Sequence, residues 1–209
     1  MQSTDRASVP AVKMGPMDLV VSPGVELHAV VLVEGPSDQQ AIERLAARRG
    51  RDLAAEGVAV LPMGGARGLG QFLRVYGPTG FDVRLAGLCD ARERRDFRRA
   101  LERAGFGDAL TDDEMEELGF FVCDADLEDE LIRSLGVDEV EQIIEAQGEL
   151  GSFRTLQKQP AQRERTPQQQ LRRFMGTRSG RKIAYASLLV DGLDLDRVPR
   201  PLDLVLAHV

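Results

Sequence analysis

The sequence has few of the residues that build disulfide frameworks or zinc sites, since it contains two cysteines, two histidines and no tryptophan. Cys89 and Cys123 each end a short apolar run, so we expect reduced thiols in the core rather than a disulfide. Because the histidines, His28 and His208, stand alone, a zinc site is not expected. No apolar stretch approaches the length of a membrane span, and the first 17 residues lack the apolar core of a signal peptide. We therefore predict a cytoplasmic protein without membrane association.

The length and composition indicate a folded α/β protein with one main domain. The chain has 209 residues, of which 43% are hydrophobic and 29% are charged. Residues 1–24 contain Ser, Thr, Pro and Gly without periodicity, which predicts a poorly ordered leader. We expect an α/β core over residues 25–135 and a helical, basic extension, packed on that core, over residues 136–209.

Charges are strongly segregated along the chain, although the net charge is only -7. Residues 107–150 hold 16 acids and one base, whereas residues 151–182 hold nine bases and one acid. Acidic clusters can bind divalent cations and basic clusters can bind phosphate backbones. Each run taken alone fits a solvated protein face equally well. Together they are compatible with an enzyme that places a metal ion beside a polyanion.

Four short apolar segments alternate with helical patterns. The expected strands are residues 28–35, 57–62, 83–89 and 119–123. Helices are expected near residues 69–75 and 93–104, and one after the first strand, capped by Ser37 or Asp38. Thr111 with Glu114 predicts a capping box. The alternation predicts a mostly parallel, Rossmann-like sheet flanked by helices.

Acidic residues follow three of the four expected strands. They are Glu34 and Asp38 after the first strand, Asp90 after the third, and Asp124, Asp126 and Glu128 after the fourth. The carboxyl ends of parallel strands lie at one edge of a sheet, where ligands of such folds bind. Carboxylates gathered there repel one another unless some are protonated or a cation is bound. The pattern therefore predicts a divalent metal site.

The stretch "GGARGLG" at residues 64–70 allows an alternative interpretation as a dinucleotide-binding turn. Asp90 lies 20 residues after Gly70, where a ribose-binding acid would stand. However, the turn follows the second strand, and a Tyr-x-x-x-Lys pair is absent. A nicotinamide-dependent oxidoreductase therefore stays a remote alternative.

Five segments stand out along the chain: "VVLVEGPSDQQAI" with its Glu-Gly-x-Ser-Asp motif, "LPMGG", "LAGLCD", "VCDADLEDELI" and "GRKIAYASLL". In this order they resemble the TOPRIM domain, and most closely the nuclease portion of the OLD (overcoming lysogenization defect) family. The resemblance covers about residues 28–190. It implies a TOPRIM-like α/β core that performs Mg²⁺- or Mn²⁺-dependent chemistry on nucleic-acid phosphodiesters.

The resemblance also implies roles for individual residues. The implied metal ligands are Glu34, Asp38, Asp90, Asp126 and Glu128, and Glu34 and Lys182 are the implied catalytic residues. One departure concerns the Asp-x-Asp pair that holds Mg²⁺ in the family, because "DAR" places Arg92 where the second acid belongs. Glu93 follows directly, but a helical start turns it about 100° away from position 92.

These features favour a TOPRIM-type endonuclease. The alternative is a catalytically weakened module that binds nucleic acid or a partner ATPase. Because the sequence has no Walker A motif, the ATPase would be a separate protein. The candidate phosphate contacts are Arg67, Arg172, Arg173, Arg178 and Arg181. The further arginines at 92, 94, 95, 98 and 99 fit a solvated helix face better. We expect the partner to be nucleic acid, with DNA favoured over RNA. The sequence is also compatible with a homodimer.

Overall fold

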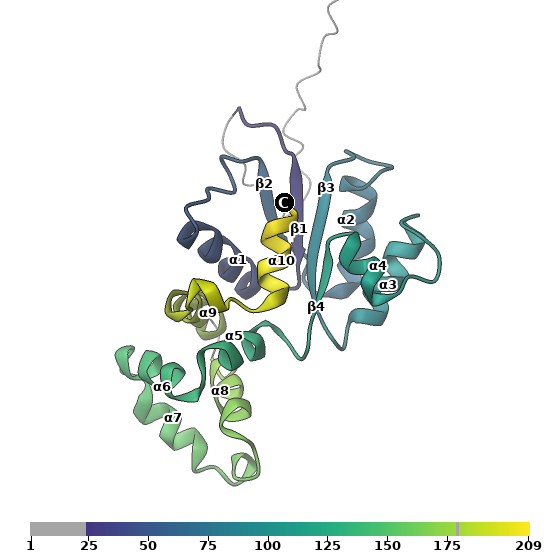
Figure 1. Ribbon diagram of the computed structural model, residues 1–209. Coiled ribbons are helices and arrows are strands. Elements are labelled where there is room, and N and C mark those ends of the chain that lie inside the picture. Colours follow the sequence, from purple (N-terminus) through teal and green to yellow (C-terminus); the bar gives the residue numbers. More distant parts are fainter. Residues whose placement is uncertain (1–23, 179) are drawn as a thin grey trace, which may run out of the picture.

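A four-stranded parallel sheet forms the centre of the protein (Figure 1). The computed structural model describes residues 24–178 and 180–209. The strands are β1 (Ala29–Val33), β2 (Val58–Pro62), β3 (Arg84–Asp90) and β4 (Phe120–Cys123), in the order β2-β1-β3-β4. All neighbours pair in parallel. The expected strands and the α/β class are thereby confirmed.

The side chains of β1 alternate between two hydrophobic cores, one on each face of the sheet. Ala29, Val31 and Val33 belong to one core, whereas Val30 and Leu32 belong to the other. All five residues are buried. A strand covered on both faces needs such an uninterrupted apolar run, which is why the sequence pattern identified it.

Helices cover both faces of the sheet, and a further group of helices lies below it in Figure 1. One face carries α1 (Pro36–Arg48) and α10 (Arg200–His208), and α9 (Arg181–Gly192) packs against α1. The other face carries α2 (Leu69–Tyr76), α3 (Arg94–Arg103) and α4 (Asp112–Glu117). The helical lobe consists of α5 (Leu127–Leu135), α6 (Val137–Ala146), α7 (Leu150–Gln157) and α8 (Pro167–Met175). Short 3₁₀ turns are η1 (Ala66–Gly68), η2 (Pro160–Gln162) and η3 (Leu195–Arg197).

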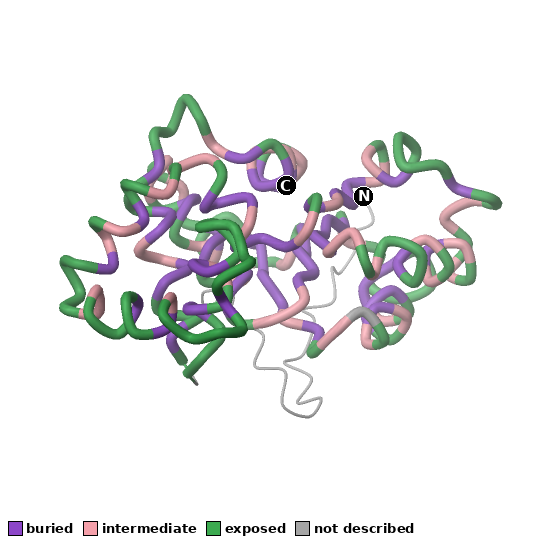
Figure 2. Tube along the Cα trace, turned by 90° about the horizontal axis from the view of Figure 1, so that it is seen from below, coloured by how far each residue is buried: buried purple, intermediate pink, exposed green. Residues whose placement is uncertain are grey.

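The expected C-terminal extension, residues 136–209, divides between these two regions. Helices α6 to α8 belong to the lobe, but α9 packs along α1 and α10 packs against β3 and β4. Helix α10 buries Leu202, Val205 and Leu206 in the same core as β1. Figure 2 shows the buried segments gathered in the middle of the molecule. The end of the chain therefore completes the layer that covers one face of the sheet. Residues 1–23 of the expected leader lie outside the described residues.

Helix starts follow local capping chemistry with one correction. The Thr111 side chain accepts a hydrogen bond from the Glu114 amide at 3.2 Å, and the Glu114 carboxylate accepts one from the Thr111 amide at 2.7 Å, which confirms the capping box. The expected cap of α1 at Ser37 or Asp38 was wrong, because the helix already begins at Pro36 with Gly35 as its N-cap. Proline is well suited to the first helical position, since that amide needs no intrahelical partner.

Candidate metal centre

The candidate site lies at the carboxyl edge of the sheet, between β1 and β3. Glu34 directly follows β1, and Asp90 is the last residue of β3. The chain leaves β1 toward β2 on one side, while β3 and β4 lie on the other side. The strand order therefore reverses between the two acids, and ligands of open α/β sheets bind at such a reversal.

The glycine turn after β2 holds the backbone of Glu34. The amides of Gly64 and Gly65 donate hydrogen bonds to the Glu34 carbonyl oxygen at 3.0 and 3.2 Å, and the Met63 amide donates to the Val33 carbonyl at 2.8 Å. The φ angles of the two glycines are 71° and 108°, a region that L side chains rarely adopt. These amides are used within the protein, which removes two donors that a pyrophosphate would require. The turn thus positions an acid rather than a dinucleotide.

Asp38 lies on the first turn of α1, near Glu34. Its carboxylate accepts a hydrogen bond from the Gly35 amide at 2.9 Å, and the residue is 8% exposed. Burial raises the pKa of Asp38, and the charges of Glu34 and Asp126 raise it further. Asp38 therefore both stabilises the helix start and contributes to the acidic cluster.

Asp126 opens α5, and both of its carboxylate oxygens have partners. Oδ1 accepts a hydrogen bond from the Asp129 amide at 2.9 Å, as an N-cap residue does. Oδ2 accepts one from Nε of Arg172 at 2.5 Å, and the Arg172 Nη2 also forms an ion pair with it. An arginine of the lobe therefore neutralises one member of the acidic cluster.

Glu128 lies in the first turn of the same helix and is 3% exposed. Its Oε2 lies 3.1 Å from Nζ of Lys182, which is in the first turn of α9. Burial raises the pKa of Glu128 to about 7, although Lys182 opposes the shift. The structure thus joins the two residues that the resemblance implies as metal ligand and catalytic lysine.

The raised pKa of Asp90 indicates that its carboxylate interacts with three of the other predicted acids. Burial, followed by the charges of Glu34, Asp126 and Asp38, raises the pKa of Asp90 to about 8. Burial, together with these like charges, therefore favours the protonated form of Asp90 near neutral pH. A divalent cation would relieve the same repulsion.

The donor set suits a hard cation, but the side chains are not gathered tightly. Among the described residues, no three His, Cys, Asp or Glu side chains are placed to hold a metal ion. Five carboxylates without a histidine match the oxygen ligands of Mg²⁺, which keeps several water molecules and needs only a few protein ligands. The bases Arg172 and Lys182 supply the positive charge beside Asp126 and Glu128.

The segment after β3 places Arg92 on the surface. Its side chain is exposed, and the Glu93 amide donates a hydrogen bond to the Asp90 carbonyl at 2.9 Å. The position where the resemblance implies a second acid therefore carries an exposed base.

Cys89 lies at the end of the apolar run of β3, and Cys123 is the last residue of β4. Both are free and buried as expected, and burial raises the pKa of both thiols.

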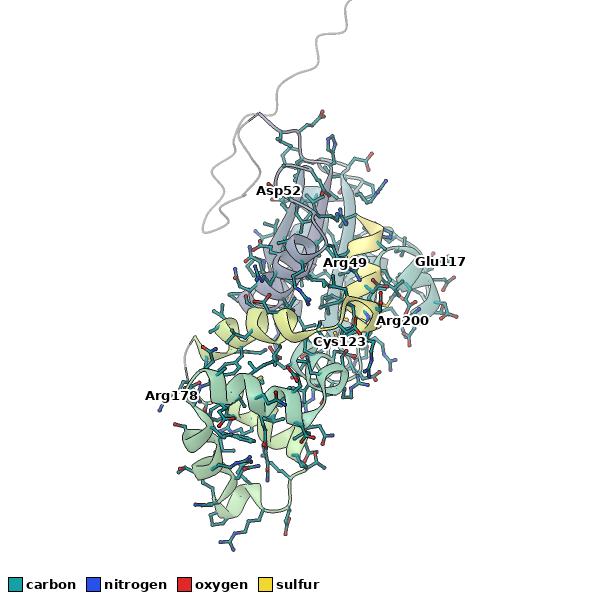
Figure 3. The ribbon with its side chains drawn as sticks, turned by 60° about the vertical axis from the view of Figure 1, so that its left-hand side comes forward. Arg49, Asp52, Glu117, Cys123, Arg178 and Arg200 are labelled. Carbon is teal, nitrogen blue, oxygen red and sulfur yellow. The ribbon has the colours of Figure 1, made fainter. Side chains whose placement is uncertain are left out.

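The five arginines predicted to contact phosphates have different environments. Arg67 in η1 and Arg173 in α8 are exposed. The Arg178 side chain is 68% exposed and lies on the outer side of the lobe (Figure 3). Arg172 is paired with Asp126, as described above. The Arg181 side chain is only 5% exposed and pairs with Glu149 inside the lobe, so its guanidinium is not presented to a ligand.

The partners of Arg172 and Arg181 could not be found from the sequence. Arg172 is 46 residues away from Asp126, and Arg181 is 32 residues away from Glu149. Both acids lie in the acidic run and both bases in the basic run, so only the segregation of charge hinted at such pairs. The basic run therefore serves partly to neutralise the acidic one.

The raised pKa values predict a pH-dependent response to metal. The folded protein holds protons on Asp90 and Glu128 more tightly than the unfolded chain, whose carboxyls titrate near pH 4. Their stabilising contribution is complete below about pH 4 and is lost as the pH rises through about 7 to 8. Mg²⁺ requires deprotonated ligands. We therefore expect Mg²⁺ to raise the Tm slightly at about pH 6 and distinctly at about pH 8.5.

Differential scanning fluorimetry with excess Mg²⁺ or EDTA measures this difference. In Asp90→Asn, the Tm without metal should be less sensitive to alkaline pH, and the Mg²⁺ effect should shrink. An equal Mg²⁺ effect at both pH values would contradict the account.

Comparisons with known proteins agree with the fold. Residues 28–91 match the family model of the overcoming lysogenization defect protein-like TOPRIM domain. The C-terminal region of the Burkholderia pseudomallei OLD protein is similar in structure, with a TM-score of 0.67 and 22% identity over 86% of this chain and 95% of that one. The C-terminal region of the Xanthomonas campestris pv. campestris OLD protein has a TM-score of 0.64 and 24% identity over 87% and 94%. No curated protein sequence matches the chain. The chain contains a TOPRIM domain that resembles the one in OLD proteins.

Proposed function

We propose that the chain hydrolyses nucleic-acid phosphodiester bonds with the help of Mg²⁺ or Mn²⁺. The observation that carries the proposal is the placement of acids at the ends of β1 and β3 and at the start of α5, where burial and the charges of Glu34, Asp126 and Asp38 raise the pKa of Asp90 to about 8. Buried acids with strongly perturbed pKa values are typical of functional sites. The TOPRIM domain supports the coarser conclusion of a family with metal-dependent nucleic-acid chemistry.

The residues fit distinct roles in such a reaction. Glu34, Asp38 and Asp90 would hold the cation from the sheet side, and Asp126 and Glu128 from α5. A bound divalent cation supplies Lewis-acid polarisation of the phosphate and an activated water molecule. Lys182 would place a positive charge near the phosphoryl oxygens, where negative charge develops. The hydrogen bonds from Gly64 and Gly65 fix the backbone of Glu34 at the end of β1.

A second candidate is a module that binds nucleic acid or a partner ATPase without cleavage. The exposed Arg92 favours it, because an acid there would strengthen the hold on a cation. The absence of three closely placed metal-binding side chains among residues 24–178 and 180–209 favours it too.

Cleavage of supercoiled plasmid and of single-stranded DNA and RNA tests the proposal. We expect nicks or fragments with Mg²⁺ or Mn²⁺ and none with EDTA. Arg92→Asp distinguishes the candidates. If the wild-type protein is inactive and Arg92→Asp gains cleavage or metal affinity by about tenfold or more, the non-cleaving module is correct. If neither protein cuts any of the three substrates, the hydrolytic proposal fails.

A further inference from the structure

The segment that leads from β3 into α3 is rich in arginine, and its arginines fall into two groups. Within α3, Arg94 and Arg98 both form ion pairs with Asp112 at the start of α4, the first at 2.7 Å. The other three arginines of the helix, Arg95, Arg99 and Arg103, are exposed. Their side chains form no ion pair or hydrogen bond with another described residue. We call them the α3 stripe.

The α3 stripe lies on the outer face of the helix. Its members are four residues apart, so successive side chains are separated by about 6 Å along the axis and turned by only about 40°. On the opposite face, Phe97 and Leu101 are buried in the core. The stripe is therefore a nearly straight row of positive charges that points away from the protein.

Few acids weaken the row. Glu102 lies beside the stripe, but its carboxylate accepts a hydrogen bond from the Leu110 amide at 3.1 Å. Asp96 is exposed on the other flank. Residues 92–103 contain six arginines and three acids, so the net charge of this segment is +3. Arg94 and Arg98 form ion pairs with Asp112. The arginines of this helix that have no ion-pair partner are therefore those of the stripe.

The α3 stripe begins beside the acidic site. Helix α3 starts four residues after Asp90, and the Glu93 amide is bonded to the Asp90 carbonyl. From there the ten-residue helix extends for roughly 15 Å along the flank of the sheet (Figure 1). Two exposed arginines lie near its start, Arg92 in the connection and Arg67 in η1, which contacts α3.

The lobe offers a less suitable surface. Two of its arginines, Arg172 and Arg181, are paired with acids. Its other exposed bases include Lys158, Arg163 and Arg165, which lie in the connection between α7 and α8. Figure 1 shows this connection at the end of the lobe farthest from the sheet. A polyanion held there would not be guided to the carboxylates.

We propose that the α3 stripe binds the phosphate backbone of a nucleic-acid strand and guides it to the acidic site. The inference rests on the proposed function and specifies where its substrate lies. The planar guanidinium group of an arginine can donate two hydrogen bonds to the oxygens of one phosphate. Each phosphate that is neutralised releases counterions, so the binding depends on the salt concentration. Unpaired arginines in a row beside a carboxylate cluster also offset its repulsion of a polyanion.

The test compares two triple variants that lose the same charge. Both are made in a Glu34→Gln background, so that bound strands are not cut. One is Arg95→Gln/Arg99→Gln/Arg103→Gln, and the control is Lys158→Gln/Arg163→Gln/Arg165→Gln. Fluorescence anisotropy with labelled single-stranded DNA, duplex DNA and single-stranded RNA gives the affinity at several salt concentrations. The three probes show which backbone is preferred.

We expect the stripe variant to bind at least about tenfold more weakly at low salt and to lose about 2 to 3 from the salt slope. The control should stay within about twofold of the parent, and all proteins should keep the same Tm. Equal losses in both variants, or a larger loss in the control, would overturn the inference. If the wild type cleaves nucleic acid and the stripe variant binds like its parent, only this inference fails. If the wild type neither binds nor cleaves, both proposals fail.

Discussion

Glu34→Gln is expected to reduce cleavage by at least about 100-fold while leaving the fold intact. Glutamine keeps the shape of the side chain but removes the charge that would hold a cation or accept a proton, and losses of about 10² to 10⁴ are typical for such groups. The backbone of Glu34 is fixed by Gly64 and Gly65, and these bonds do not involve the side chain. The Tm of the variant should therefore stay close to that of the wild type, or rise slightly as repulsion with Asp90 falls.

Glu43→Gln is the matched control for this variant. Glu43 lies on α1, the helix that follows Glu34, and accepts a hydrogen bond from the Gln39 side chain at 2.9 Å, so the same chemical change occurs away from the sheet's carboxyl edge. Single-turnover cleavage with Mg²⁺ should be unchanged in the control. Full activity in purified Glu34→Gln would exclude Glu34 from the reaction.

Arg181→Ala is expected to destabilise the protein by about 2 to 4 kcal/mol. The Arg181 guanidinium donates hydrogen bonds to Glu149 at 2.6 and 3.2 Å, to the Phe174 carbonyl at 3.2 Å and to the Thr177 hydroxyl at 2.6 Å. It also lies 4.0 Å from the centre of the Phe174 ring. Removing it leaves the carbonyl and the carboxylate without these donors. Because Glu149 is 25% exposed, water offsets part of the loss, and the range lies below that of a fully buried pair.

Arg178→Ala distinguishes this structural role from loss of charge alone. Arg178 also faces Glu149, but at 3.7 Å and with 68% exposure, so its removal should cost less than about 0.5 kcal/mol. Urea unfolding of both variants gives the free energies of unfolding. If Arg181→Ala is as stable as the wild type but binds nucleic acid more weakly, Arg181 contacts the ligand and has no structural role.

The strands could be predicted from the sequence because a parallel strand covered on both faces requires an uninterrupted apolar run. "HAVVLVEG" and "VRLAGLC" show such runs, and the structure has strands there. The sequence did not distinguish helix α10 from the rest of the expected extension. Its packing on β3 and β4 depends on contacts between residues that are distant in sequence. The start of α1 was misplaced, since Ser37 and Asp38 are good caps in isolation but Pro36 sets the first turn.

The location of Glu34 and Asp90 at one edge of the sheet could be predicted, because the carboxyl ends of parallel strands meet at that edge. Their roles as metal ligands stay a prediction. The bases could not be assigned in the same way, because composition gives a charge run but not its partners. Arg172 contacts Asp126 and Arg181 contacts Glu149, whereas the unpaired row lies on α3, which had been interpreted as a solvated face. Only the folded arrangement shows which arginines remain free.

Anomalous diffraction from crystals soaked in Mn²⁺ tests the central claim most directly. We expect an anomalous peak at the carboxyl edge of the sheet, between the carboxylates of Glu34, Asp90 and Glu128, at a pH near 8.5 where Asp90 is largely ionised. The peak should disappear in Glu34→Gln crystals. A wild-type crystal that binds Mn²⁺ elsewhere, or not at all under saturating soaks, would contradict a metal centre at this edge.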